Sequence, residues 1–125
     1  MSATTTVTMI PGTSFGTAIG NYDGSATSFQ SDNTKGDGYY GFSDGVHTTQ
    51  LRVTGFPGTV TFQGSLATTP TDSDFVDISG AVLTGDGSTL VTNSFIYNFT
   101  GNFVWIRASI TNFTAGSINT ILLAH

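Results

Sequence analysis

The amino-acid sequence predicts an all-β protein, an antiparallel β-sandwich or jelly roll of about eight strands. Short runs in which apolar and polar residues alternate recur along the chain, and Gly, Asn and Asp separate them. No window of helical length keeps an apolar period of 3.6 residues. The chain has 125 residues and no cysteine, so we expect one domain without disulfide bonds.

The alternation is clear in the run TVTFQGSL, where Val60, Phe62 and Leu66 share one face and Thr and Gln occupy the other. Such a pattern is typical of a half-buried antiparallel strand. Turn signals such as Asp-Gly, Pro-Gly and Ala-Gly bound the runs. We expect strands at residues 4–10, 14–19, 46–54, 58–66, 74–79, 89–99, 103–112 and 117–124.

The predicted core follows from the same period of two. In the run VHTTQLRV, Leu51 and Val53 share a face with His47 and Thr49. The inward-facing side chains of the later strands are predicted to be Val60, Phe62, Leu66, Val104, Ile106, Ile110, Ile118 and Leu122.

The run NFVWIRASITNF raises a separate question, because both of its faces carry large side chains. One face is apolar, and the other carries Phe103, Trp105 and Arg107. Trp and Arg are enriched at the centres of protein interfaces. We therefore predict that Phe103, Trp105 and Arg107 form an interface with another protein or another copy. The intramolecular alternative is cover by a second sheet, a bent strand or the folded-back N-terminal region.

The first 40 residues differ from the rest, because Gly, Ser, Thr, Asn and Asp dominate them. Structureless segments of this length are uncommon in compact domains. Two interpretations remain open: residues 1–40 form an extended arm that orders on a neighbour, or they form a weakly patterned edge of the sandwich. In both, residues 41–125 make up the β-sandwich domain.

The charge content limits the partners that we expect. Charged residues make up only 9% of the chain, all eight acids are Asp, and the formal net charge is −5. Nucleic-acid binding needs clustered Lys and Arg, so we expect none. No run approaches the roughly 18 apolar residues of a membrane helix, so we expect no membrane partner.

Two Gly-x-Ser-x-Gly segments, at residues 12–16 and 41–45, match the nucleophile pattern of hydrolases. Neither is followed by a predicted helix, which that chemistry requires, so we do not expect an enzyme. The two histidines, His47 and His125, do not form a pair with zinc-ligand spacing. We expect no cofactor.

Two groups of residues are candidates for ligand binding. Asp72, Asp74 and Asp77 lie close together in the run TPTDSDFVD and are a weak calcium candidate, although the EF-hand pattern is absent. Tyr22, Tyr39, Tyr40 and Trp105 are possible sugar-stacking residues, and among them Tyr39 and Tyr40 are the chosen candidates, since exposed aromatic rings often mark binding sites. The structural alternatives are turn capping by the Asp residues and burial of the Tyr rings.

A set of short segments in residues 46–125 resembles the small β-sandwich virion proteins of tailed bacteriophages. A strand ending in Gln-Gly-Ser precedes a Thr/Pro/Asp-rich loop and an aromatic-x-Asp-Ile strand. A strand with Trp-Ile-Arg, an Ala-Gly turn and a last apolar strand follow. These segments are Gln63-Gly64-Ser65, Phe75-Val76-Asp77-Ile78, Trp105-Ile106-Arg107 and Ala115-Gly116.

The resemblance implies a structural protein of the virion and carries over no catalytic residue. It implies capsid decoration, or cement, as the role, with the major capsid protein or other virion proteins as partners. It also implies a homo-oligomer, for which we expect a trimer. The alternative function is a carbohydrate- or receptor-binding β-sandwich module of a phage tail or fibre.

Overall fold

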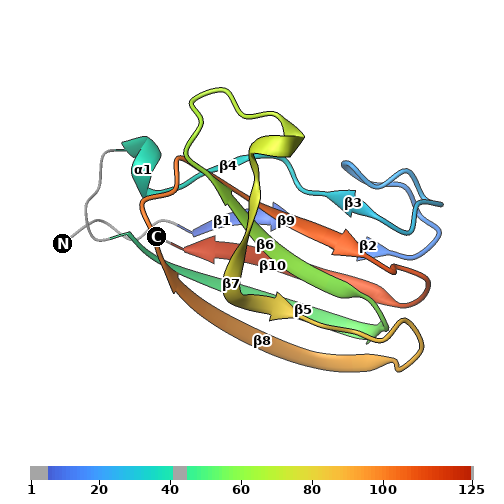
Figure 1. The fold of residues 1–125 in the computed structure, drawn as a ribbon. Coiled ribbons are helices and arrows are strands. Elements are labelled where there is room, and N and C mark those ends of the chain that lie inside the picture. The colour runs from blue at the N-terminus through green and yellow to red at the C-terminus, as the bar shows by residue number, and fades with distance from the viewer. Residues whose placement is uncertain (1–5, 41–44, 125) are drawn as a thin grey trace.

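The structure is a computed structural model. It describes residues 6–40 and 45–124, except for the side chains of Asp37, Tyr40 and Ser79. These residues form two antiparallel sheets that pack face to face (Figure 1). The first sheet contains β1 (Thr6–Ile10), β2 (Thr13–Ser14), β5 (Val46–Phe56), β8 (Val91–Thr100) and β10 (Ser117–Ala124). The second contains β3 (Phe29–Gln30), β4 (Thr34–Lys35), β6 (Thr59–Ser65), β7 (Val76–Leu83) and β9 (Trp105–Thr111).

Both sheets have five strands, and the first strand, β1, pairs with the last strand, β10. The first sheet runs β1-β10-β5-β8, with β2 also paired to β10, and the second runs β3-β9-β6-β7, with β4 also paired to β9. A short helix, α1 (Asp37–Tyr40), follows β4, and a 3₁₀ turn, η1 (Asp72–Asp74), lies between β6 and β7. The predicted antiparallel sandwich is therefore confirmed.

Alternation decides which side chains enter the core. In β5, His47, Thr49, Leu51 and Val53 are all buried, as predicted. Among the side chains predicted to face inward, Val60, Phe62, Ile106, Ile110 and Ile118 are fully buried, while Val104 is half-buried.

Two predicted core residues are placed differently. Leu66 is 71% exposed, because β6 ends at Ser65 and the period of two does not continue into the loop. Leu122 is only half-buried, whereas Ile121 and Leu123 are fully buried. A register shift between Ile118 and Thr120 changes the phase of β10, so that the residues after it alternate in the opposite sense.

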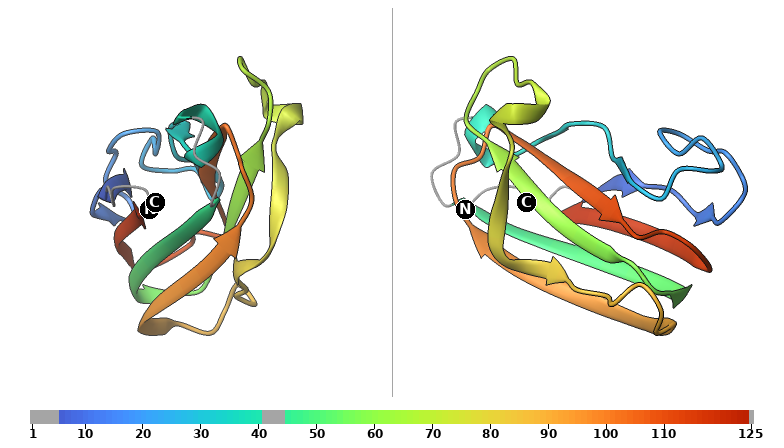
Figure 2. Two further views of the ribbon diagram at one scale, coloured as in Figure 1. Left: turned by 90° about the vertical axis from the view of Figure 1, so that its left-hand side faces the viewer. Right: turned by 45° about the vertical axis from the view of Figure 1, so that its right-hand side comes forward.

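Residues 6–40 lie along one side of the sandwich, where they pair with β10 and β9 (Figure 1). The strand predicted at 14–19 is wrong beyond Ser14, and the short β3 and β4 were not predicted. The rings of Tyr22 and Phe29 belong to the core, where both contact Phe113, with centroid distances of 5.0 and 6.0 Å. β1 and β7 lie at opposite sides of the molecule (Figure 2).

Candidate functional site

A row of polar side chains crosses the outer face of the second sheet. The register of β6 places Gln63 opposite Asp77 of β7 on one side and opposite Arg107 of β9 on the other. Gln63 donates its amide hydrogen to Asp77 Oδ1 at 2.8 Å and accepts from Arg107 Nε at 2.8 Å. The strand pairing therefore fixes the position of the guanidinium group.

Arg107 is buried by its own chain. Its side chain is 9% exposed, and its guanidinium carbon lies 4.2 Å from the centroid of the Phe75 ring. Nη1 donates to Oδ1 of Asp72 at 2.8 Å, although the Asp72 side chain is 93% exposed. A planar guanidinium suits this place because it stacks on a ring while donating in its own plane.

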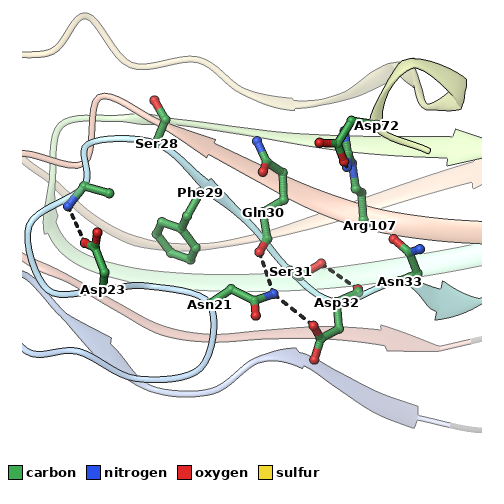
Figure 3. Close-up of a pocket in the computed structure, with 11 residues that line it drawn as sticks. Asn21, Asp23, Ser28, Phe29, Gln30, Ser31, Asp32, Asn33, Asp72 and Arg107 are labelled. Atoms are coloured by element: carbon green, nitrogen blue, oxygen red, sulfur yellow. Dashed lines mark hydrogen bonds and ion pairs between the residues drawn. The ribbon is translucent and has the colours of Figure 1, made fainter. Parts of the chain in front are cut away.

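An open hollow of about 480 Å³ lies beside Arg107, along β3 and the segment that follows it (Figure 3). The amide of Asn21 donates to the Gln30 carbonyl oxygen at 2.9 Å and to Asp32 Oδ1 at 3.0 Å. Asn33 and Asp72 also line this hollow, which we call the polar hollow. Its walls present amides, carboxylates and a guanidinium group to one space.

A second hollow, of about 340 Å³, shares Asp32 and Asn33 with the polar hollow and extends to Lys35 and Trp105. We call it the aromatic hollow, and the two together the edge groove. The indole N–H of Trp105 donates to the Thr68 carbonyl oxygen at 3.2 Å, which fixes the ring. The edge groove therefore joins polar groups at one end to an aromatic ring at the other.

One acid of the polar hollow has a shifted pKa. The backbone N–H groups of Ser25 and then Ala26 donate to Asp23 Oδ1, at 2.8 and 2.7 Å, and lower the pKa of this carboxyl below its usual value. Asp23 therefore stays ionised and holds the turn that borders the hollow.

The structure separates the three residues predicted to form an interface. Arg107 lines the polar hollow and Trp105 the aromatic hollow, whereas Phe103 packs toward the core, 6.1 Å from the rings of both His47 and Phe99. The predicted face was wrong for Phe103, because β9 begins at Trp105 and the alternation does not extend back to it.

Phe103 also reaches the surface, through a third hollow of about 390 Å³ that Leu66 and Val76 border. Gly64 lines this hollow too, and the Phe103 ring lies directly over its Cα, where a Cβ would meet the ring. Leu66 and Val76 are 71% and 68% exposed. We call Leu66, Val76 and Phe103 the apolar pocket.

The three residues of the calcium candidate have separate protein partners. Asp72 pairs with Arg107, Asp77 accepts from Gln63, and Asp74 accepts from the backbone N–H of Thr71 at 2.8 Å. Within the described residues, no three His, Cys, Asp or Glu side chains are grouped to hold a metal ion. The structure thus gives Asp74 the capping role of the structural alternative, while Asp72 and Asp77 pair with side chains.

The remaining predicted site residues are scattered. Tyr39 is 46% exposed and contacts Trp105, with ring centroids 5.2 Å apart, while the side chain of Tyr40 lies outside the described part. His47 is fully buried, and His125 lies outside the described residues. Of the two Gly-x-Ser-x-Gly segments, the first contains β2, and residues 41–44 of the second are not described.

Sequence reasoning missed Asn21, Gln30, Asp32 and Asn33. The run FQSDN was available as a signal, since four consecutive polar residues follow a core Phe. It was obscured by the similar composition of the whole N-terminal region. In the described part of the chain, no helix is long and apolar enough to cross a membrane.

The chain matches no protein-family model and no curated protein sequence. The solved structure of the SPBc2 prophage-derived protein YomS is similar over 98% of this chain and 91% of its own, with a TM-score of 0.56 and 12% identity. The C-terminal CBM6 of LamC from Zobellia galactanivorans covers 98% of this chain and 100% of its own, with a TM-score of 0.46 and 12% identity. PirA covers 100% and 94%, with a TM-score of 0.43 and 11% identity. At this level of identity, the likeness to the prophage-derived protein shows a shared fold.

Proposed function

We propose that this protein is a structural component of a bacteriophage particle, and more specifically a capsid decoration protein. In this role it binds the capsid surface and neighbouring copies of itself, and it catalyses no reaction. The observation that carries the proposal is the apolar pocket at the paired ends of β6 and β7, where Phe103 reaches the surface.

The apolar pocket is unusual for a surface that stays in water. Leu66 and Val76 are both more than two-thirds exposed, and the hollow beside them reaches the ring of Phe103. Contiguous exposed apolar side chains usually mark a protein contact. A partner side chain that enters this hollow would bury Leu66, Val76 and the accessible part of Phe103 together.

The outer face of the first sheet supports close packing against protein as well. Its strands carry Arg52 as their one charged residue and contain no acid. The exposed side chains there are mostly Thr, Ser, Asn and Gln, with Ile96 62% exposed among them. Covering neutral side chains costs much less free energy than covering charges.

The shared fold with a prophage-derived protein is consistent with a phage origin. The pattern of Gln63-Gly64-Ser65, Trp105-Ile106-Arg107 and the Ala-Gly turn supports the same class. We extend the proposal to a homotrimer on the particle, which rests on the resemblance to decoration proteins.

The test is rebinding of purified protein to particles that lack it. The variant Leu66→Ser with Val76→Thr should lose most of its particle binding while its unfolding transition stays cooperative. The matched control is Leu90→Ser, which removes a similarly exposed apolar side chain from the segment before β8 and should bind as the wild type does. Full occupancy by the Leu66→Ser, Val76→Thr variant would contradict the assigned surface. Failure of the wild-type protein to bind particles of the phage that encodes it would contradict the proposed decoration function.

A further inference from the structure

We propose that the edge groove binds a neutral oligosaccharide, with sugar hydroxyls in the polar hollow and a sugar ring against Trp105. This site shares no lining residue with the apolar pocket, so the inference goes beyond the structural role proposed above.

The first argument is the shape of the edge groove. Its two hollows, of about 480 and 340 Å³, meet at Asp32 and Asn33. Each falls within the size range of small-molecule sites, which is roughly 300–1,000 Å³. An extended ligand that passes Asp32 and Asn33 would contact both hollows, as a chain of sugar units does.

The second argument is the hydrogen-bonding capacity left in the polar hollow. Within the described residues, the side-chain amides of Gln30 and Asn33 make no hydrogen bond. Arg107 uses two of its five N–H groups, on Gln63 and Asp72, although its side chain is 91% buried. Buried donors normally have acceptors, so the remaining N–H groups of Arg107 favour a ligand oxygen.

The third argument is charge, which selects the class of ligand. Asp23, Asp32 and Asp72 face the groove, against the cations Arg107 and Lys35. The excess of carboxylates repels phosphates and acidic sugars. A hydroxyl both donates and accepts, so it can bond to a carboxylate, an amide and a guanidinium group in turn. Neutral polyhydroxyl ligands match this mixture.

The fourth argument is the aromatic wall. A sugar ring has an apolar C–H face, and such a face packs on an aromatic ring that is held in place. Trp105 is held by its hydrogen bond to Thr68 and by contact with Tyr39. The ring is partly exposed in the aromatic hollow, directly next to the polar residues that bind hydroxyls.

Trp105 provides the assay, because it is the one tryptophan of the chain. The full-length protein is titrated with cellohexaose, laminarihexaose, maltohexaose and chitohexaose up to about 10 mM, and its fluorescence is recorded. We expect at least one of them to change Trp105 emission saturably, with a Kd of about 1 mM or tighter. The same ligand should shift the side-chain amide NMR signals of Gln30 and Asn33.

Two glutamines provide a matched pair of variants. Gln30→Ala removes an amide from the groove, and Gln50→Ala removes one from the exposed face of the first sheet. We expect Gln30→Ala to weaken binding by about tenfold and Gln50→Ala to leave it unchanged. Asn33→Ala is a second groove variant in case the first is unstable.

Three results would overturn the proposal. One is the absence of any change in Trp105 emission and amide signals with all four hexasaccharides. Another is equal weakening by Gln30→Ala and Gln50→Ala. The third is loss of binding in about 1 M NaCl, where charge attraction is screened, since that would indicate an ionic ligand. None of these outcomes bears on whether the protein binds the capsid through the apolar pocket.

Discussion

Arg107 shows how a charged residue is accommodated in the face of a sheet. Its guanidinium group donates a hydrogen bond to Gln63 and lies over the Phe75 ring, while its carboxylate partner Asp72 is exposed to water. The free energy of this arrangement therefore depends more on packing and on the buried hydrogen bond than on the ion pair.

We predict unequal effects of removing the two partners of this ion pair. Arg107→Ala should lower the free energy of unfolding by about 2–4 kcal/mol, because it uncovers Phe75 and leaves Gln63 unpaired. Asp72→Ala should cost less than about 1 kcal/mol, because an exposed partner adds little. Urea unfolding of both variants measures the difference. Equal losses would show that the ion pair dominates.

Gly64 makes room for the Phe103 ring, which lies over its Cα. Gly64→Ala should therefore destabilise the protein by about 1–3 kcal/mol, through displacement of the ring. The same substitution made together with Phe103→Leu should cost less, because the smaller side chain leaves space for the added methyl group. A cost that is unchanged by Phe103→Leu would mean that the contact with this ring is not the cause.

Asp86 holds the turn before β8 by accepting hydrogen bonds from the backbone and side chain of Thr89 and the backbone of Ser88. These bonds lower the pKa of Asp86 well below the usual 3.8, and the bond from the backbone N–H of Thr89 has the largest effect. Because the folded-state pKa is lowered, the carboxylate stabilises the fold above the usual pKa, and this contribution is lost as the pH falls through the folded-state value.

We expect the stability difference between wild type and Asp86→Ala to narrow as the pH falls from about 5 to about 2. Asp86→Asn is the control, since it keeps an acceptor oxygen but cannot titrate. Urea unfolding at each pH gives the comparison. A difference between wild type and Asp86→Ala that stays constant over this range would contradict the role of the charge.

At the scale of elements, the edge strands depend on their neighbours rather than on their own sequence. β3 and β4 have two residues each, too few to show a period, and they form because β9 offers free backbone groups to pair with. The phase of β10 was missed for a related reason. A register shift lies between Ile118 and Thr120, and the consecutive apolar residues 121–123 that follow do not reveal which of them face inward. The long strands β5, β6 and β9 were predictable because their alternation is undisturbed.

Deletion of residues 1–20 tests whether this region is an arm or an edge of the sandwich. It removes β1 and β2, together with the buried Met9 and Ile10, and leaves one edge of β10 unpaired. We expect the shortened chain to lose cooperative thermal unfolding. A shortened chain that stays folded, with an unchanged near-UV circular dichroism spectrum, would instead support a separable arm.

At the scale of the whole molecule, the fold class was predictable, whereas of the edge groove only Trp105 and Arg107 were singled out from the sequence. Composition and alternation specify a sandwich, because they determine which faces can be buried. The edge groove joins Trp105 and Arg107 of β9 to Asn21 and Asp32, which lie far earlier in the sequence and are brought there by the pairing of β3 and β4 with β9. No local pattern encodes such a meeting.

The central claim is that this chain is part of a virion, and quantitative mass spectrometry of purified particles tests it directly. Particles of the phage that encodes the chain are purified through a density gradient, and copies of the chain are counted relative to the major capsid protein. We predict that the chain is present in a fixed ratio to the capsid protein and is lost from particles when its gene is deleted. Its absence from particles that are otherwise complete, while it is abundant in the infected cells, would contradict the claim.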